Sequence, residues 1–189
     1  MAHFRSFSVP RHCQLGVSLV ELMVVVVVLA MLATFALPAF ADLTARQRLR
    51  GAADNLRGDL VFARSEAIKR QTHVFVVFSR GAQWCYAVTL DPTCGCDRVC
   101  NSPDSLLRQI HSSESAEGVE LLTATFAGTF CGAEECVRFD PFHGNAAGSN
   151  GTATFLGAEG SKYKVIVAAI GRARACRASG DSGGFLPTC

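Results

Sequence analysis

A long apolar run that holds a single carboxylate constrains this chain more than any other feature. The run extends from Val17 to Phe40, and Glu21 is its one charged residue. As a helix with a rise of about 1.5 Å per residue, it would be roughly 36 Å long, enough to cross a bilayer. The residues before it include Arg5 and Arg11 and no carboxylate. This charge pattern predicts that the N-terminal end stays in the cytoplasm while the remainder is exported.

The order of glycine and apolar run differs from that of a conventional signal peptide. A secretory signal carries its cleavage site after the apolar core, whereas Gly16 comes directly before it. Cleavage after Gly16 would remove residues 1–16 as a leader and give Val17 a free amino group. A carboxylate within a membrane costs roughly 3 kcal/mol, so Glu21 needs a partner such as that amino group on a neighbouring subunit. A position close to the lipid headgroups is the alternative explanation.

The nine cysteines indicate an oxidising compartment such as the periplasm. Cys13 belongs to the expected leader, and the other eight form an even set, typical of a disulfide framework with open connectivity. Only Cys176 and Cys189 suggest a pair, from their proximity. A metal site at Cys94–Cys100 lacks a second tight pair at zinc spacing, so we expect disulfides, no metal and no cofactor. The candidates are Cys85, Cys94, Cys96, Cys100, Cys131, Cys136, Cys176 and Cys189.

Beyond Phe40 the pattern predicts that the helix continues as an amphipathic segment over 41–71. Apolar residues recur every three or four positions, and the arginines lie off this stripe, as on a solvated face. Glu66 can pair with Arg70, four residues later. The stripe comprises Leu49, Ala53, Leu56, Leu60, Ala63 and Ala67, and the arginines are Arg46, Arg50, Arg57, Arg64 and Arg70.

From Thr72 onward the pattern changes to short β-branched and aromatic runs, which are typical of strands. Residues 72–79 and 84–90 predict a hairpin, and 91–103 a cysteine-rich loop. A Gly/Asn/Ser-rich connection is expected at 145–151. Residues 72–189 are therefore expected to form a periplasmic, β-rich head, an antiparallel sheet assembly packed on the second half of the helix, in the α+β class. The further strands are expected at 119–126, 136–140, 152–156 and 162–170.

The N-terminal motif resembles that of the type IV pilin and pseudopilin superfamily. Gly16-Val-Ser-Leu-Val-Glu21 is similar to the family's prepilin peptidase site, although Val17 replaces the usual phenylalanine. Pro38 stands where these proteins commonly carry a helix-kinking proline. The resemblance implies a type IV pilin-like fold, cleavage and N-methylation by a prepilin peptidase, and assembly in which Glu21 meets the terminal amine of an adjacent subunit. It also implies a single-pass protein of the bacterial inner membrane whose partners are other pilins or pseudopilins.

Segments beyond the N-terminal motif resemble, more specifically, those of the GspH/FimT family. This family spans type II secretion pseudopilins and minor pilins of type IV pili. The likeness covers essentially the whole mature chain. The segments that carry it are Ala63-Arg-Ser-Glu-Ala-Ile68, Val137-Arg-Phe-Asp-Pro-Phe-His-Gly144, Gly151-Thr152 and Gly171-Arg-Ala-Arg-Ala-Cys176.

The basic C-terminal tail is the candidate binding site. Gly171-Arg172-Ala173-Arg174 has the form G-R-x-R, which in the FimT branch is associated with binding DNA during natural transformation. Two guanidinium groups separated by one residue can both reach phosphates, which gives affinity without sequence preference. Residues 160–180 contain no carboxylate, and the expected DNA-binding set is Gly171, Arg172, Arg174, Arg177, Lys162 and Lys164.

Other functions remain open. Basic residues also protect edge strands from aggregation, and loss of Arg5 and Arg11 leaves sixteen basic against sixteen acidic side chains. The alternative function is a GspH-like structural subunit of a type II secretion or type IV pilus system, which primes filament assembly and protein secretion without binding DNA. A tip adhesin that uses the Cys94–Cys100 loop is a weaker third possibility.

The sequence gives no reason to expect an enzyme. It contains no nucleophile elbow, no H-E-x-x-H motif and no P-loop. Asp140 and His143 resemble a catalytic pair, but a strand-to-turn junction accounts for both.

Overall fold

The structure, a computed structural model, describes residues 18–96, 100–126, 130–131, 135–180 and 186–189, without the side chains of 35–39 and Ser115. The chain divides into two compact units, residues 1–40 and 41–189, which are considered separately. Helix α1 (Leu19–Arg70) contributes to both units.

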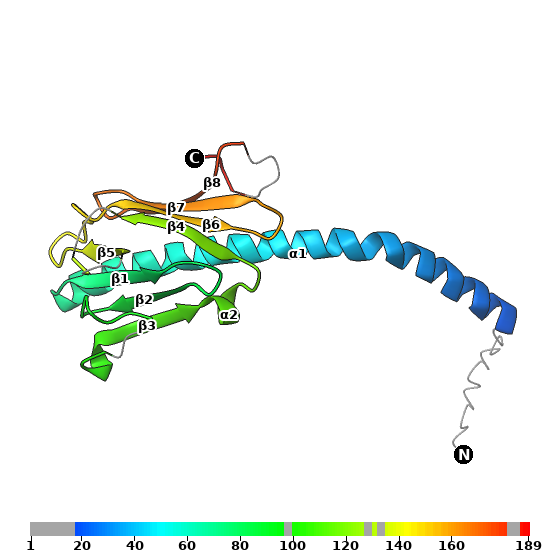
Figure 1. The fold of residues 1–189 in the computed structure, drawn as a ribbon, viewed down its shortest axis with the longest axis horizontal. Helices are drawn as coiled ribbons and strands as arrows, with labels where there is room; N and C mark the ends of the chain where they lie inside the picture. Colours follow the sequence, from blue (N-terminus) through cyan, green and yellow to red (C-terminus); the bar gives the residue numbers. More distant parts are fainter. Residues whose placement is uncertain (1–17, 97–99, 127–129, 132–134, 181–185) are drawn as a thin grey trace, which may run out of the picture. The chain divides into compact units, whose positions relative to one another are not determined.

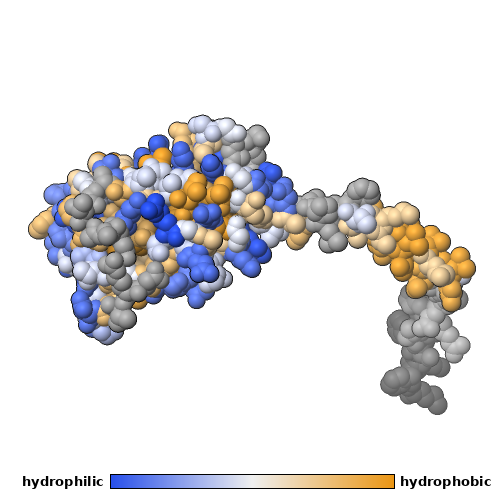
Figure 2. Space-filling view, in the orientation of Figure 1, coloured by the Kyte–Doolittle hydropathy of each residue, from blue (hydrophilic) through white to orange (hydrophobic). Residues whose placement is uncertain are grey.

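In the first unit, α1 presents an apolar surface to its surroundings. The side chains from Leu19 to Leu32 include many large apolar residues that are half exposed or more, and the face drawn in Figure 2 is largely hydrophobic over this end of α1. Exposed apolar surface of this extent is unusual for a soluble monomer and indicates an interaction. Within the described ranges, no helix combines the length and the apolarity needed to cross a membrane, so the span expected at 17–40 remains a prediction.

In the second unit, the remainder of α1 packs its apolar stripe into the core. Every residue of the expected stripe is buried, and Leu49, Leu56 and Leu60 are among the largest fully buried side chains. The expected ion pair at the end of the helix is present, with 2.6 Å between Arg70 Nε and Glu66 Oε2. This hydrogen bond lowers the pKa of the Glu66 carboxyl.

Two four-stranded antiparallel sheets complete the head (Figure 1). The first has the order β3-β2-β1-β5 and the second the order β4-β6-β7-β8. The predicted hairpin is confirmed as β1 and β2, with Val77 opposite Ala87. The strands are β1 (Val74–Ser79), β2 (Cys85–Thr89), β3 (Leu106–His111), β4 (Glu120–Phe126), β5 (Glu135–Phe139), β6 (Gly151–Leu156), β7 (Lys162–Val167) and β8 (Ala173–Arg177). Short helical turns lie at η1 (Pro103–Ser105) and α2 (Ser112–Ser115).

The structure corrects the sequence-based strand assignments in three places. Strand β3 lies where no strand was expected, and β8 replaces what was expected to be a tail. Strand β7 ends at Val167, before the expected end at Ile170, because a tight turn follows in which Gly171 N donates to Ala168 O at 2.8 Å. The class is α+β with a pilin-like arrangement of helix and antiparallel sheet, as predicted.

One buried polar network joins α1 to the first sheet. The Tyr86 hydroxyl donates to Asp59 Oδ2 at 2.7 Å, and Arg108 Nη1 donates to Asp59 Oδ1. The side chain of Asp59 is 6% exposed and that of Arg108 is 47% exposed. Burial raises the pKa of Tyr86, so this phenol stays protonated and donates its hydrogen bond to the carboxylate.

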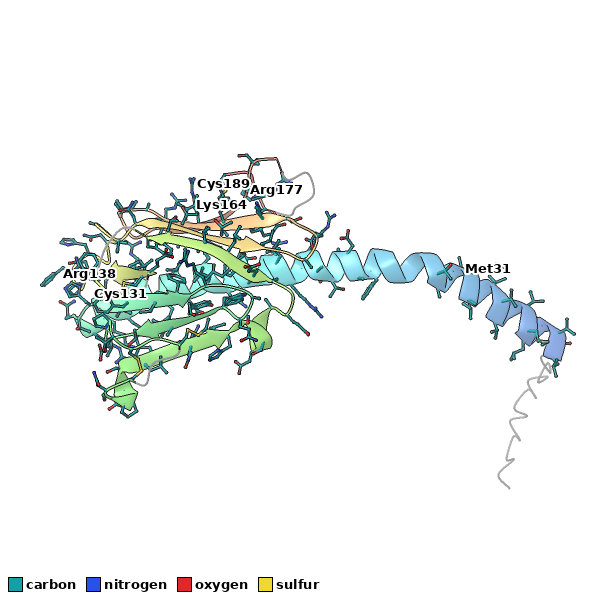
Figure 3. The ribbon with its side chains drawn as sticks, in the orientation of Figure 1. Met31, Cys131, Arg138, Lys164, Arg177 and Cys189 are labelled. Carbon is teal, nitrogen blue, oxygen red and sulfur yellow. A yellow bond between two sulfur atoms is a disulfide. The ribbon has the colours of Figure 1, made fainter. Side chains whose placement is uncertain are left out.

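All eight candidate cysteines are paired. Cys85–Cys96 and Cys94–Cys100 secure the loop after β2, and Cys131–Cys136 lies at the start of β5. Cys176–Cys189 ties the C-terminus to β8 (Figure 3). The expected set of eight is thus the paired set, and the pair suggested by proximity, Cys176 with Cys189, is present.

Candidate nucleic-acid interface

The turn between β7 and β8 sets the position of the arginine motif. Ala168 N donates to Arg172 O at 3.0 Å, and Gly171 N donates back to Ala168 O. Gly171 has a φ of 78°, a conformation that side chains disfavour. A Cβ at Gly171 would also collide with the backbone carbonyl oxygen of Gly144. The first residue of the G-R-x-R motif must therefore be glycine for two independent reasons.

Strand alternation then separates the basic residues by face. Arg174 lies opposite Ile166 on β7, and the next pair on the same face joins Cys176 to Lys164. Arg172 and Arg174 are exposed, and Lys164 is half-buried. Since side chains two residues apart share a face, Arg172, Arg174 and Lys164 project from the same side of the second sheet.

Arg177 does not join this group. It pairs with Tyr163, whose side chain is buried in the core, so it projects from the opposite face of β8. Its Nε atom is buried, and among the described atoms it has no hydrogen-bond partner. Its backbone bonds to the C-terminal segment, with Arg177 N donating to Pro187 O and Cys189 N donating to Arg177 O. Figure 3 marks Arg177 and Cys189 in this region.

A groove between the edge of β8 and α1 collects arginines from both elements. It has a volume of about 210 Å³, and the two exposed arginines of the motif line it together with Arg57. Asp54, which also lines the groove, is bound to Arg50 Nε at 3.3 Å. Within the described ranges Arg57, Arg172 and Arg174 form no ion pair, so their charge is directed to solvent. The remaining lining residues are Ala173, Ala175 and Leu186.

Arg57 is the member of the site that sequence reasoning missed. Its position off the apolar stripe predicts an exposed side chain, and it is exposed. Nothing in the local sequence indicates that this face of α1 lies beside β8, because that neighbourhood is created by the tertiary fold.

The backbone of β8 presents unpaired polar groups at the same groove. β8 is an edge strand of its sheet, and within the described ranges only an isolated bridge between Arg177 and Thr188 pairs with its outer side. The C-terminal segment covers that side at Arg177. Because backbone direction alternates along a strand, the N–H groups of Ala173 and Ala175 face the same side as that of Arg177. Ala173 and Ala175 line the groove, so this open edge offers their N–H and C=O groups to a bound molecule.

Lys162 lies away from the arginine groove. It is exposed, and it lines a separate depression of about 330 Å³ together with Glu159, Ser179 and Gly180. Of the expected set, the structure therefore brings Arg172 and Arg174 together, places Lys164 on their face, and separates Arg177 and Lys162 from them.

The expected processing and assembly residues are only partly described. Gly16 and Val17 lie outside the described residues. Glu21 is exposed in the first turn of α1, and no residue in the described part of the chain forms an ion pair with it. Pro38 lies within α1, and its side chain is outside the description.

The apparent Asp140–His143 pair has a structural explanation. Asp140 Oδ1 accepts the backbone N–H groups of Phe142 and His143, each at 2.9 Å, and so organises the turn after β5. These hydrogen bonds, chiefly the one from His143, lower the pKa of the Asp140 carboxyl. Among the described residues, no group of three or more His, Cys, Asp or Glu side chains is arranged to hold a metal ion.

Comparison with known proteins assigns the family. The family model described as type II transport protein GspH matches residues 52–171, from the buried part of α1 to the turn before β8. The model of the prokaryotic N-terminal methylation motif matches residues 11–37, which include Gly16 and Glu21. No curated protein and no solved structure matches the chain. Because the GspH match covers more than half of the sequence, the chain belongs to the GspH family of pilin-like proteins and is a minor pilin or pseudopilin, a membrane-anchored component of a pilus or pseudopilus.

Proposed function

We propose that this minor pilin binds extracellular DNA through the groove beside β8, for uptake in natural transformation. The observation that carries the proposal is that three arginines, Arg57, Arg172 and Arg174, line one groove. The G-R-x-R motif supplies two of them, and the fold supplies the third. Three cations beside an open strand edge suit a phosphate backbone better than a single anion.

The chemistry of the groove supports binding without sequence selection. Guanidinium groups and backbone N–H groups bind phosphate oxygens, which are the same at every base pair. Lys164 projects from the same sheet face as Arg174 and can lengthen the basic track. Binding of this kind depends on salt, because it releases counterions from the DNA.

A binding assay tests the proposal. The full-length protein, oxidised and held in non-ionic detergent, would be titrated with a duplex of random sequence at several salt concentrations. The comparison is the double variant Arg172→Ala/Arg174→Ala, with Arg80→Ala as a matched control. Arg80 lies outside the groove and faces Glu135, with 3.8 Å between Nε and Oε2. Salt-sensitive binding that is lost only in the double variant supports the proposal, and binding that is unaffected contradicts it.

The alternative is a structural subunit that primes filament assembly without binding DNA. Two observations favour it: the family description names type II transport, and that match ends at Gly171, before both arginines of the motif. The exposed apolar surface of α1 between Leu19 and Leu32 supports packing against other subunits or lipid. If the chain is incorporated into filaments and shows no affinity for DNA, the structural role is the only one supported.

The N-terminal part of the proposal follows from the methylation motif. We expect cleavage after Gly16, methylation of Val17, a bilayer anchor within 17–40 that includes Pro38, and an assembly contact made by Glu21. Glu21→Gln should leave cleavage intact and abolish incorporation into filaments, measured by mass spectrometry of the mature N-terminus and by fractionation of sheared filaments. Normal incorporation of this variant into filaments would show that assembly does not need the Glu21 carboxylate.

A further inference from the structure

Two large apolar side chains project from the head beside the arginine motif. Phe142 is 72% exposed and Ile170 is 67% exposed, the highest fractions among the large hydrophobic residues described for the head. Phe142 lies in the turn after β5, and Ile170 lies in the turn that leads into β8. Exposed apolar side chains that lie on adjoining turns are more informative than single ones, because apolar surface patches mark binding sites.

The turn that carries Phe142 is held rigidly. Asp140 Oδ1 accepts the backbone N–H of Phe142, and Gly144 N donates to Asp140 O at 2.9 Å. Gly144, with a φ of 61°, packs against α1 so closely that a Cβ there would lie 2.8 Å from the side chains of Arg64 and Ile68. The ring of Phe142 therefore extends outward from a fixed backbone.

The two turns adjoin one another. Gly144 contacts Gly171 through its carbonyl oxygen, and Ala146 N donates to Ala169 O at 2.8 Å. Ile170 is separated from Arg172 by Gly171 alone. The fold thus places an exposed aromatic ring, an exposed aliphatic side chain and the first arginine of the motif on neighbouring turns.

We propose that Phe142 stacks on an unpaired base, with Ile170 on the adjoining turn, so that the site prefers single-stranded DNA or frayed ends over intact duplex. This inference rests on the proposed DNA-binding function. A phosphate track next to an aromatic platform is the usual arrangement for binding single strands, because each base offers a π face. In a duplex the bases are already stacked on one another, so Phe142 gains little there. The adjacent arginines favour this occupant over the apolar surface of a second protein.

The test compares single-stranded and duplex DNA of equal length. The full-length oxidised protein in non-ionic detergent would be titrated with a thymine oligonucleotide and with a duplex, for the wild type and Phe142→Ala. Leu122→Ala is a matched control, because Leu122 is a partly exposed apolar residue on β4. Phe142→Trp adds a spectroscopic readout, since the natural Trp84 is 1% exposed and gives a constant background.

We expect Phe142→Ala to weaken single-strand binding by about fivefold or more and duplex binding by less than about twofold. Phe142→Trp should restore affinity, and its fluorescence should fall when the single strand binds. Equal weakening of single-strand and duplex binding, or no weakening of single-strand binding, would overturn the stacking role.

The double variant Arg172→Ala/Arg174→Ala separates the stacking inference from the proposed DNA-binding function. If this variant weakens binding of both ligands while Phe142→Ala changes neither, only the stacking inference fails. If the double variant changes neither ligand, the DNA-binding function itself fails. Loss of association with another pilin in Phe142→Ala, with unchanged DNA binding, would assign the ring to a protein partner.

Discussion

The carbonyl oxygen of Gly144 occupies the place where a side chain at Gly171 would begin. This contact joins the turn that carries Phe142 to the turn that leads into Arg172 and Arg174. It also explains why the arginine motif starts with glycine, since both the positive φ of Gly171 and the nearby backbone exclude a side chain. The position of the arginines thus depends on a contact between residues 27 positions apart in the sequence.

Gly171→Ala should destabilise the head and displace the arginines. The substitution adds the cost of a positive φ, about 1 kcal/mol, to a collision with backbone that cannot rotate away. Gly160→Ala is the control, because Gly160 has a φ of 84° and open space around its Cβ position. Thermal unfolding should show a larger loss of Tm for Gly171→Ala than for Gly160→Ala, together with weaker DNA binding. Equal losses would show that the Gly144 contact has no energetic importance.

Arg57→Ala should weaken DNA binding about as much as either arginine of the motif. Arg57 lines the same groove, so its removal takes away one phosphate contact, worth about fivefold in affinity. The slope of log affinity against log salt should become shallower by about 0.9. Arg80→Ala provides the control for a general loss of positive charge. If both variants bind equally well, Arg57 is only part of a solvated helix face.

Tyr86→Phe should lower the free energy of unfolding by about 1.5–3 kcal/mol, because it removes a buried hydrogen bond to a charged group. Asp59→Ala should cost more, since it leaves the Tyr86 hydroxyl without an acceptor and removes the partner of Arg108. Urea denaturation of both single variants and the double variant forms a cycle that isolates the interaction. Strictly additive losses would mean that this hydrogen bond does not stabilise the head.

Asp140 should make the stability of the head depend on pH in the acid range. Its pKa is lowered chiefly by the backbone N–H of His143, so the ionised form is favoured by folding. The stabilisation is complete above the ordinary aspartate pKa, about 3.9, and is lost as the pH falls through the lowered value. Urea midpoints of the wild type should exceed those of Asp140→Asn near neutrality, and the difference should shrink on acidification. A difference that is constant with pH would assign the effect to packing.

Much of the fold could be predicted because the strongest patterns are local. The stripe from Leu49 to Ala67 has helical spacing, and the hairpin at 72–90 has dense β-branched runs, so neither depends on distant residues. Strand β8 was missed because Ala173-Arg-Ala-Cys-Arg177 contains no β-branched or aromatic residue. Strand β3 was missed because Leu106-Leu-Arg-Gln-Ile-His111 shows no alternation of apolar and polar residues, and five of its six residues are intermediate in burial.

The site depended more on tertiary structure than the fold did. The resemblance of the tail to a G-R-x-R motif predicted Arg172 and Arg174, but Arg57, which lines the same groove, is more than a hundred residues away in the sequence. Arg177 has the same charge and lies close to them in the sequence, yet its place in β8 directs it to the other face. Disulfide pairing shows the same dependence, since Cys96 bonds to Cys85 and not to either neighbour in its own loop.

The salt dependence of DNA affinity tests the central claim most directly. The full-length protein would be titrated with duplex DNA between about 50 and 200 mM salt, in the wild type and in Arg172→Ala/Arg174→Ala. The account predicts that affinity falls steeply with salt and that the double variant has a slope shallower by about 1.8, because two phosphate contacts are lost. Affinity that is absent in the wild type, or a slope that the double variant leaves unchanged, would contradict it and leave a pilin whose partners are other subunits.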